Sequence, residues 1–444
     1  MTSRSPEPTP ILHLAALALP VLVVACGNDD GVPAPGATHA TSTTAATSAT
    51  YYKNVKPIFD AKCGKCHTEG GIAPFATDDP TVVAEYAPLI KIAVENKTMP
   101  PWLAGDGCTD YVADRSLDDA QIATIGQWAD AGAPIGDPAD VGAPLDTGPD
   151  YALSRVDLSL EMPVEYTAKI TPDEYRCFVV DWPEEATKFA TGFRAKPGNA
   201  AVVHHVIAYV AGAGQAAAVD QLDAADDGPG YQCFGGYDPT GNTLDPQQVS
   251  FLGGWAPGGP GNDFPKGTGV RIEPGAKVML QVHYNSLTAG VQPDRTRIEV
   301  KLDDQVEKEA WIQPWTNPQW LSGDAMLIPA GQKDVVHKFE IDPTPYISDG
   351  DAITVYSATL HMHVLGKSGR IWIDHEGGSS ECLLDIPRWN FHWQNPFGFA
   401  EPKLIAPGDR LGVECHWDNT TASDVVWGEG TTDEMCVGFL YMTK

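Results

Sequence analysis

The chain has 444 residues, of which 43% are hydrophobic and 20% charged, and this is the composition of a globular protein with room for about three domains. Its 59 acidic and 29 basic residues give a formal net charge of -30 at pH 7. Phosphate repels such a surface, which argues against nucleic acid, or an anionic membrane surface, as a binding partner. The 44 glycines and 37 prolines favour β structure with many turns.

The first 26 residues predict a lipoprotein signal peptide. Arg4 precedes an apolar segment that runs from Ile11 to Val24, and this segment is too short to span a bilayer. It ends in Val-Val-Ala-Cys, which resembles the bacterial lipobox, so we expect Cys26 to be the lipidated first residue of the mature protein. The alternative is an ordinary signal peptide with an incidental cysteine.

Residues 27–50 are rich in Ala, Thr, Ser and Pro and have no apolar period, which predicts a disordered tether. We therefore expect an exported protein, anchored by lipid to the bacterial envelope and facing the periplasm or the cell surface. Export places the remainder of the chain in an oxidising compartment, where disulfides form.

A c-type haem attachment pattern, Cys-x-x-Cys-His, is formed by Cys63, Cys66 and His67. In this pattern the two thiols bond the haem vinyl groups and the histidine binds the iron. A redox disulfide or half of a zinc site would use the same cysteines, but the adjacent histidine and the exported setting favour haem. Met99, which two prolines follow, is the candidate for the opposite axial ligand. The alternative for Met99 is the usual role of methionine as core filler.

The residues around this pattern predict a small all-α cytochrome c domain over residues 51–140, with one covalently bound haem c. The spacing of apolar residues predicts helices over residues 51–62 and 82–95. A third helix is expected to have Ser116 as its N-cap and to end at Gly132.

Beyond a linker rich in Pro, Gly and Asp (residues 136–150), the chain changes to short runs of β-type residues separated by Gly, Pro, Asn and Asp. This pattern is typical of β-sandwiches, and its length suits two of them. We place them at residues 155–305 and 306–444, so the expected fold is mainly β. The strands that the pattern predicts include residues 200–210, 276–284, 297–302, 353–365 and 410–415.

Five of the twelve histidines have a spacing that suits metal binding. His204 and His205 are adjacent, and neighbours on an ideal strand face opposite ways, so both reach one metal only at a bulge or a strand end. His283 lies in an alternating strand and is the candidate third imidazole. His361 and His363 are two residues apart in an expected strand, so they share one face of it. Taken alone, this second pair is better explained by two structural histidines.

Met435 adds a thioether close to the C-terminus. Three imidazoles in the first β domain, and two imidazoles with one thioether in the second, suit two copper ions that cycle between Cu(I) and Cu(II). The sulfur ligand favours the reduced state.

Together these motifs resemble the copper type II, ascorbate-dependent monooxygenases, which include peptidylglycine α-hydroxylating monooxygenase and dopamine β-monooxygenase. The resemblance spans residues 170–444 and rests on four motifs in the family order. These are the His-His pair, Leu-Gln-Val-His-Tyr around His283, His-x-His-x-x-Gly at 361–366 and Glu-Met-Cys at 434–436. It implies two antiparallel β-sandwiches that face each other across a solvent-filled cleft, with one copper on each.

The resemblance also implies a role for each ligand set. The copper that stores an electron would be held by His204, His205 and His283. The catalytic copper, which activates O2 and hydroxylates a C–H bond of a small organic substrate, would be held by His361, His363 and Met435.

A disulfide between Cys415 and Cys436 is implied by the same resemblance. We further expect Cys177 to pair with Cys233, whereas two cysteines have no assigned partner, namely Cys108 and Cys382.

Two positions depart from the peptide-processing branch of the family. Thr359 stands where that branch has an arginine that grips a substrate carboxylate, and Phe439 stands where it has a tyrosine near the substrate. A glycine-extended peptide is therefore a poor candidate, and the substrate is not identified.

The leading interpretation is a copper-dependent monooxygenase whose electrons are supplied through the fused haem. An external donor, ascorbate or a redox protein, would reduce the haem, which we expect to pass electrons singly to the three-histidine copper. The alternative is a haem and copper electron-transfer protein, or a copper-binding protein, without oxygenase activity. Substrate-dependent uptake of O2 distinguishes the first interpretation from the others.

Overall fold

A computed structural model describes residues 49–69, 73–146, 152–233, 236–240, 243–245, 248–256, 259, 261–287, 289–428 and 430–444. The expected signal peptide, the expected lipidation site Cys26 and nearly all of the expected tether lie outside these residues. The chain divides into two compact units, Met1–Thr47 and Ser48–Lys444, and every described residue belongs to the second. In the described part, none of the helices combines the length and the apolar character needed to cross a membrane.

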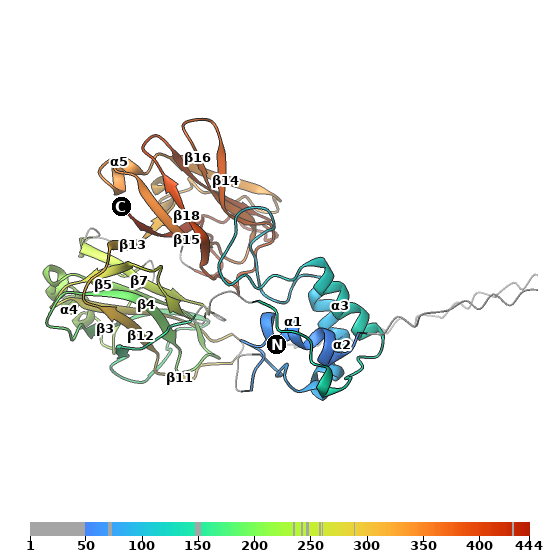
Figure 1. The fold of residues 1–444 in the computed structure, drawn as a ribbon. Coiled ribbons are helices and arrows are strands. Elements are labelled where there is room, and N and C mark those ends of the chain that lie inside the picture. Colours follow the sequence, from blue (N-terminus) through green and yellow to red (C-terminus); the bar gives the residue numbers. More distant parts are fainter. Residues whose placement is uncertain are drawn as a thin grey trace, which may run out of the picture. The chain divides into compact units, whose positions relative to one another are not determined.

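Helices dominate the first 90 or so described residues, consistent with the all-α region expected there. They are η1 (Tyr51–Val55), α1 (Lys56–Lys62), α2 (Pro80–Glu95), α3 (Asp119–Asp130) and the short η2 (Pro138–Asp140). Figure 1 shows α1, α2 and α3 grouped together, and they share a core that includes Tyr51, Phe59 and Trp128.

The expected cap of the third helix was wrong by two residues. Asp118, not Ser116, accepts a hydrogen bond from the backbone of Gln121, whose side chain in turn accepts one from the Asp118 backbone. This reciprocal pair is a capping box, so the helix begins at Asp119, two residues later than a cap at Ser116 would place it.

Residues 158–303 form the first β region. Its strands are β1 (Leu158–Glu161), β2 (Tyr166–Thr167), β3 (Asp173–Asp181), β4 (Lys188–Lys196), β5 (Val203–Ala211), β6 (Tyr231–Gln232), β7 (Val249–Trp255), β8 (Asn262–Asp263), β9 (Thr268–Ile272), β10 (Lys277–Asn285), β11 (Pro293–Asp294) and β12 (Arg297–Asp303). Two helices, η3 (Ala213–Gln215) and α4 (Ala216–Ala224), follow β5.

Residues 308–443 form the second β region. Its strands are β13 (Lys308–Trp315), β14 (Val335–Ile341), β15 (Ile353–His361), β16 (Gly366–Asp374), β17 (Ser380–Ile386), β18 (Phe397–Ile405), β19 (Arg410–Trp417) and β20 (Val437–Thr443). Two short helices, η5 (Pro318–Leu321) and α5 (Thr344–Ile347), lie between strands.

One long sheet passes through both β regions. Its strand order is β1-β12-β4-β9-β13-β20-β15-β18, with β8 paired to β4. A five-stranded sheet, β6-β3-β10-β5-β7, belongs to the first region, and a four-stranded sheet, β14-β19-β16-β17, to the second. The strands pair antiparallel except where β13 meets β9 in parallel, which is the join between the two regions.

Each half of the long sheet packs against one of the shorter sheets, which gives two hydrophobic cores. The first core joins Leu280 of β10 to Ile298 of β12, and the second joins Ile371 of β16 to Leu440 of β20. Ala310 belongs to the first core and Trp315 to the second, so the chain passes from one core to the other within β13. The protein is therefore mainly β, with two sandwiches that share a sheet.

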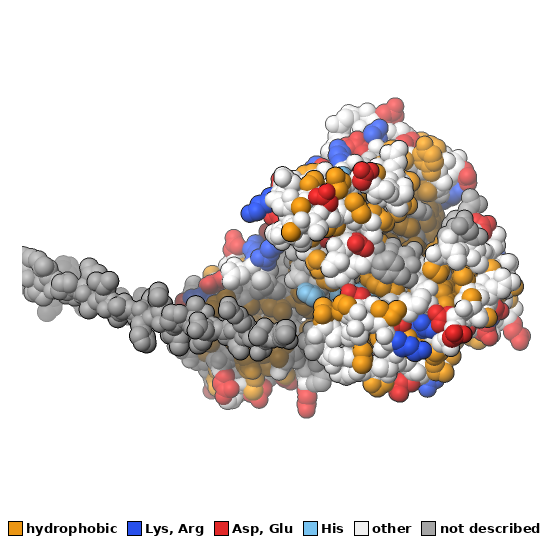
Figure 2. Space-filling view, turned by 180° about the vertical axis from the view of Figure 1, so that it is seen from behind, with side chains coloured by type: hydrophobic (Ala, Val, Ile, Leu, Met, Phe, Trp, Pro, Cys, Tyr) orange, Lys and Arg blue, Asp and Glu red, His pale blue; other side chains and the backbone are white. Residues whose placement is uncertain are grey.

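The segment that follows α2 is fastened to the second sandwich. A disulfide joins Cys108 to Cys382, the two cysteines to which the sequence assigned no partner. The backbone N–H of Gly105 donates to the Asp385 carbonyl over 2.8 Å, and Tyr111 pairs with Phe399 in a β-bridge. Acidic and basic side chains are interspersed on the face drawn in Figure 2.

Candidate metal centres

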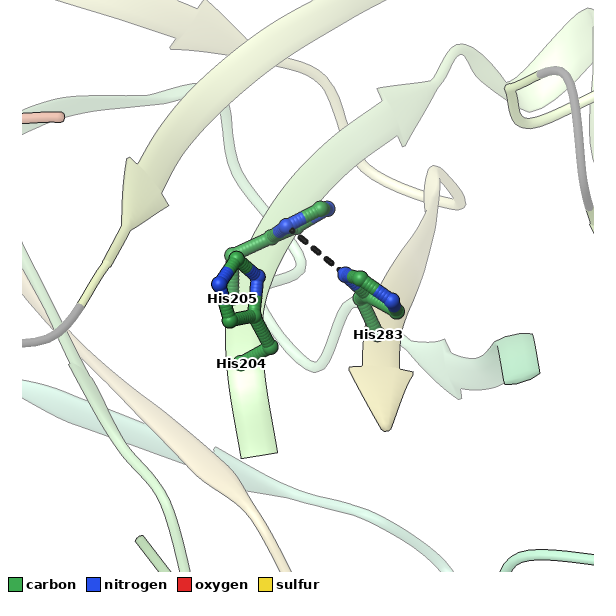
Figure 3. Close-up of side chains that lie close together, drawn as sticks. All are labelled: His204, His205 and His283. Atoms are coloured by element: carbon green, nitrogen blue, oxygen red, sulfur yellow. Dashed lines mark hydrogen bonds between the residues drawn. The ribbon is translucent and has the colours of Figure 1, made fainter. Parts of the chain in front are cut away.

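Three histidines meet on the five-stranded sheet, on the face opposite the first core. His283 on β10 lies opposite His205 on β5, and the next pair along the ladder is Tyr284 with Val203. His204 is thus the extra residue of a β-bulge, the arrangement that the adjacent histidines require if both are to reach one metal. One nitrogen from each ring lies within 4.8 Å of the others. Figure 3 shows the three rings converging from the two strands.

A carboxylate orients one of these rings. Nε2 of His283 donates to Oδ1 of Asp173 over 2.9 Å, and its Nδ1 lies 3.2 Å from Nδ1 of His205. The proton is thereby held on Nε2, which leaves the Nδ1 lone pair directed at the other rings. Carboxylates that fix the tautomer of a ligating histidine in this way are characteristic of metal sites.

Burial keeps the three imidazoles neutral. It lowers the pKa of His204 to about 3, with a further contribution from neighbouring imidazoles, and lowers the pKa of His205 well below its ordinary value for the same reasons. Burial also lowers the pKa of His283, although the Asp173 carboxylate opposes this. A neutral imidazole is the form that binds a metal ion.

His204 supplies the test of whether a metal fits. Both of its ring nitrogens are buried and have no hydrogen-bond partner among the described residues. An unsatisfied buried polar group costs about 1–3 kcal/mol, and a bound metal ion would satisfy one of the two. The donor set of three neutral imidazoles suits copper.

The second centre forms where β15 ends. His361 is the last residue of that strand and His363 lies beyond it, so the expected strand over 353–365 was too long and the shared-face argument does not apply. The two rings nevertheless lie 5.0 Å apart, inclined at 80°. Nδ1 of His361 donates to Oε1 of Gln394 over 2.5 Å, and Nδ1 of His363 donates to the Asp433 carbonyl over 3.0 Å.

These hydrogen bonds leave Nε2 of each ring available as a ligand. Burial lowers the pKa of His361 to about 3 and that of His363 to about 4, so both imidazoles are neutral. The pair therefore fits a metal ion by the same criterion of charge as the three-histidine centre.

Met435 is held near this pair by its neighbours. It is 6% exposed and lies between Glu434 and Cys436, which forms a disulfide with Cys415 as the resemblance implied. The buried Glu434 carboxylate accepts hydrogen bonds from the backbone N–H groups of His363 (2.8 Å) and Leu365 (2.6 Å). The loop that carries the thioether is therefore tied to the loop that carries His363. Burial raises the pKa of Glu434 to about 7.

Residues that the sequence did not single out lie between the two centres. The Phe391 ring stacks on His204 with 4.7 Å between centroids and lies 6.1 Å from the ring of His363. The ring of His392 lies 6.2 Å from that of His204. No ligand-like spacing marks either residue, so the sequence held no signal for them.

The candidate haem ligands lie in the helical region. Cys63 and Cys66 are outside any disulfide, whereas the other six described cysteines are paired, including Cys177 with Cys233 as expected. Backbone N–H groups of Cys66 and His67 donate to the Cys63 carbonyl, which forms a tight turn after α1. His67 Nδ1 donates to the Phe75 carbonyl over 3.1 Å, so its Nε2 is available. Burial lowers the pKa of His67, which favours the neutral ring.

One face of α2 leaves large apolar side chains uncovered between His67 and Met99. Tyr86 is 36% exposed, Leu89 63% and Ile92 55%, at helical spacing. At one end Phe75 stacks on Tyr86 at 4.4 Å and lies 4.6 Å from the His67 ring. At the other end Met99, itself 38% exposed, donates its backbone N–H to Ala93. A flat apolar group attached at Cys63 and Cys66 would cover this face, so the residues fit a haem.

Two clusters of buried, neutral histidines, one on each of two joined β-sandwiches, are thus the candidate metal centres of this chain. Models of the N-terminal and C-terminal domains of the copper type II ascorbate-dependent monooxygenases match residues 158–290 and 320–443, together more than half of the chain. The chain therefore belongs to the copper type II ascorbate-dependent monooxygenase family.

Curated relatives agree with this assignment. DBH-like monooxygenase protein 1 of Gallus gallus is 26% identical over 204 residues, which cover 42% of this chain and 32% of that protein. Tyramine beta-hydroxylase of Caenorhabditis briggsae is 24% identical over 225 residues, 46% of this chain and 36% of that protein. The chain thus spans about a third of the length of these relatives.

Proposed function

We propose that this protein is a copper-dependent monooxygenase that hydroxylates a C–H bond of a small organic substrate with O2. The observation that carries the proposal is the pair of buried, neutral histidine clusters, each in one of the two domains that the family models match. The Caenorhabditis briggsae relative is named a hydroxylase, which supports the same class of reaction.

The two centres have different tasks in this proposal. Copper, when bound, supplies one-electron redox chemistry and the activation of O2. His204, His205 and His283 hold the ion that stores an electron, with Asp173 fixing the orientation of His283. His361, His363 and Met435 hold the catalytic ion, and the thioether favours its reduced state. The overall reaction takes one O2, two electrons and two protons and yields the alcohol and water.

We further propose that residues 51–140 form a cytochrome c domain that supplies the electrons. Cys63 and Cys66 bond one haem c, His67 binds its iron through Nε2 and Met99 is the opposite ligand, supported by the uncovered apolar face of α2. Met99→Ala should remove the methionine–iron charge-transfer band of the oxidised protein. An unchanged band would assign the second axial ligand to another residue.

The substrate class follows from two departures from the peptide-processing branch. Thr359, opposite Phe439 in the pairing of β15 with β20, offers no cation for a substrate carboxylate. The Phe439 ring lies 6.5 Å from that of His361, so an aromatic ring without a hydroxyl stands beside the proposed catalytic centre. A small organic molecule without a carboxylate suits these residues.

Export and lipid attachment at Cys26 complete the proposal, on the basis of the lipobox-like sequence before that residue. The protein would face the periplasm or the cell surface. Cys26→Ser should abolish incorporation of labelled fatty acid and release the protein from the membrane fraction, and continued labelling would contradict the anchor.

Substrate-dependent uptake of O2 is the test of the oxygenase activity. Copper-loaded protein with ascorbate as reductant should consume O2 only when a suitable small organic substrate is present. The variant His361→Ala should show no substrate-dependent uptake of O2. A protein that binds copper and haem but consumes no O2 with any member of a substrate panel would be an electron-transfer or copper-binding protein instead.

A further inference from the structure

One short segment of the second sandwich contacts the helical region and both metal centres. It runs from Arg388 to Gln394 between β17 and β18, and we refer to it as the bridging segment. Its contacts with the three regions come from side chains that lie within seven consecutive residues.

At its start, the bridging segment binds the end of α2. Arg388 donates from Nη1 to the Asn96 carbonyl over 2.8 Å and from Nη2 to the Lys97 carbonyl over 2.5 Å. Carbonyls at a helix C-terminus have no partner within the helix and carry partial negative charge, so a guanidinium there is stabilising. Because Met99 follows two residues later, Arg388 fixes the loop that presents the proposed axial ligand.

In its middle, the segment reaches the three-histidine centre. The Phe391 ring is nearly parallel to that of His204, inclined at 20° with 4.7 Å between centroids. Phe391 is the third residue after Arg388, and three steps of extended chain span at most about 11 Å.

The same segment also contacts the second centre. Trp389 donates from Nε1 to the His363 carbonyl over 2.9 Å, and Gln394 accepts from Nδ1 of His361. The disulfide between Cys108 and Cys382 and the hydrogen bond from Gly105 to Asp385 hold the adjoining chain in place.

We propose that the bridging segment is the connection through which an electron passes from the haem to the three-histidine copper, entering beside Arg388 and leaving through Phe391. This inference rests on the proposed function and names the residues of its internal electron transfer. One electron leaves the ferrous haem and reduces Cu(II) to Cu(I), no proton moves, and an external one-electron donor reduces the haem again. Arg388 and Phe391 act as positioning residues, because neither binds a metal.

Spatial intermediacy does not by itself establish coupling, so a rate must be measured. Oxidised full-length protein loaded with haem and copper is mixed without O2 with less than one equivalent of a fast one-electron donor. The absorbance of ferrous haem should rise and then fall as the electron reaches copper. Over the same time the Cu(II) electron paramagnetic resonance signal of freeze-quenched samples should decline. In copper-free protein the haem should stay reduced.

Phe391→Leu should slow the second phase by about tenfold or more, since small misplacements change such rates by this order. Phe391→Tyr keeps the ring and should retain the wild-type rate. Direct reduction of copper by ascorbate should be the same in both variants and in the wild type. A wild-type rate in Phe391→Leu, or equal slowing in Phe391→Tyr, would overturn the inference.

The anchor is tested separately by hydrogen exchange. Arg388→Met should speed exchange of the amides of Lys97, Thr98, Met99 and Trp102 and should slow electron transfer. Arg410→Met, which removes an exposed pair with Glu340, should change neither. Unchanged exchange in Arg388→Met would contradict the anchoring role. A wild-type protein without haem, or without substrate-dependent O2 uptake, would instead contradict the proposed function.

Discussion

The two candidate metal centres are built in different ways. All three candidate ligands of the first stand on β5 and β10. Strand β10 pairs with β3 over nine residues and with β5 over eight, and a single bulge brings the third ring into place. The second centre has one ligand at the end of a strand and two in loops. Its geometry depends on Glu434, on a disulfide and on side chains from the bridging segment.

The geometry of the first centre is therefore fixed by the sheet itself, whereas the geometry of the second is fixed by the contacts that hold its loops. Changes to those contacts should therefore affect the second centre strongly and the first hardly at all.

The largest effect is expected for Met435→Ala, which should abolish hydroxylation while the three-histidine centre still binds copper. The reason is that loss of the soft ligand disfavours Cu(I) at the catalytic centre. Product formation and the Cu(II) spectrum measure the two parts. Met442→Leu is the control, a volume-conserving change at a fully buried methionine of the same sandwich, and it should retain activity. Wild-type turnover in Met435→Ala would make Met435 a core residue.

Glu434→Ala should destabilise the second sandwich by about 3–5 kcal/mol, because three buried donors lose their acceptor. These are the backbone N–H groups of His363 and Leu365 and the indole of Trp417. Urea unfolding measures the loss, and the catalytic centre should bind copper weakly in the folded variant. Glu434→Gln keeps one acceptor oxygen and should lose less. Equal stability of the alanine variant and the wild type would show that the loops are held by other contacts.

Removal of the Cys415–Cys436 disulfide, by serine at both positions, should cost about 3 kcal/mol. It should also weaken copper binding at the second centre, since Cys436 adjoins Met435. Serine at both Cys177 and Cys233 is the matched change in the first sandwich. That variant should lose stability but keep copper at the three-histidine centre, whose ligands stand on the ladder. Loss of copper from both centres in both variants would contradict the comparison.

The smallest effect is expected for Asp173→Asn, which should lower the copper affinity of the first centre by about 10- to 100-fold. The cause is the loss of the charge that fixes the His283 tautomer. Copper titration monitored by electron paramagnetic resonance separates the two centres. Asp181→Asn, on the same strand but paired with Lys277, is the control and should not change either affinity.

Local sequence pattern predicted many of the strands and the geometry of the adjacent histidines. The adjacent histidines required a bulge, and the ladder contains one at that point. The strands were predicted to within a few residues because runs of β-type residues end at Gly, Pro, Asn and Asp. The predicted strand over 353–365 was too long, because the apolar run continues past the end of β15 at His361 into a turn.

The remainder depends on chain segments that meet only after folding. Nothing around Cys108 identifies Cys382 as its partner, 274 residues away. Arg388 and Phe391 lie in a segment without regular structure, so no period marks them. Their partners are two backbone carbonyls and an imidazole ring on other parts of the chain. Strand order is equally invisible to local pattern, and the sheet shared by both sandwiches could not be predicted from it.

That shared sheet has a consequence for anyone who wishes to study one sandwich alone. Dividing the chain after β12 would separate β13 from β9. Each half would then have an exposed edge strand with unpaired backbone N–H and C=O groups. Exposed edge strands pair with strands of other molecules, so each half should aggregate when it is expressed alone. Co-expression of the two halves should restore the pairing of β13 with β9 and keep both halves soluble. The two sandwiches must therefore be expressed together, although each has its own hydrophobic core.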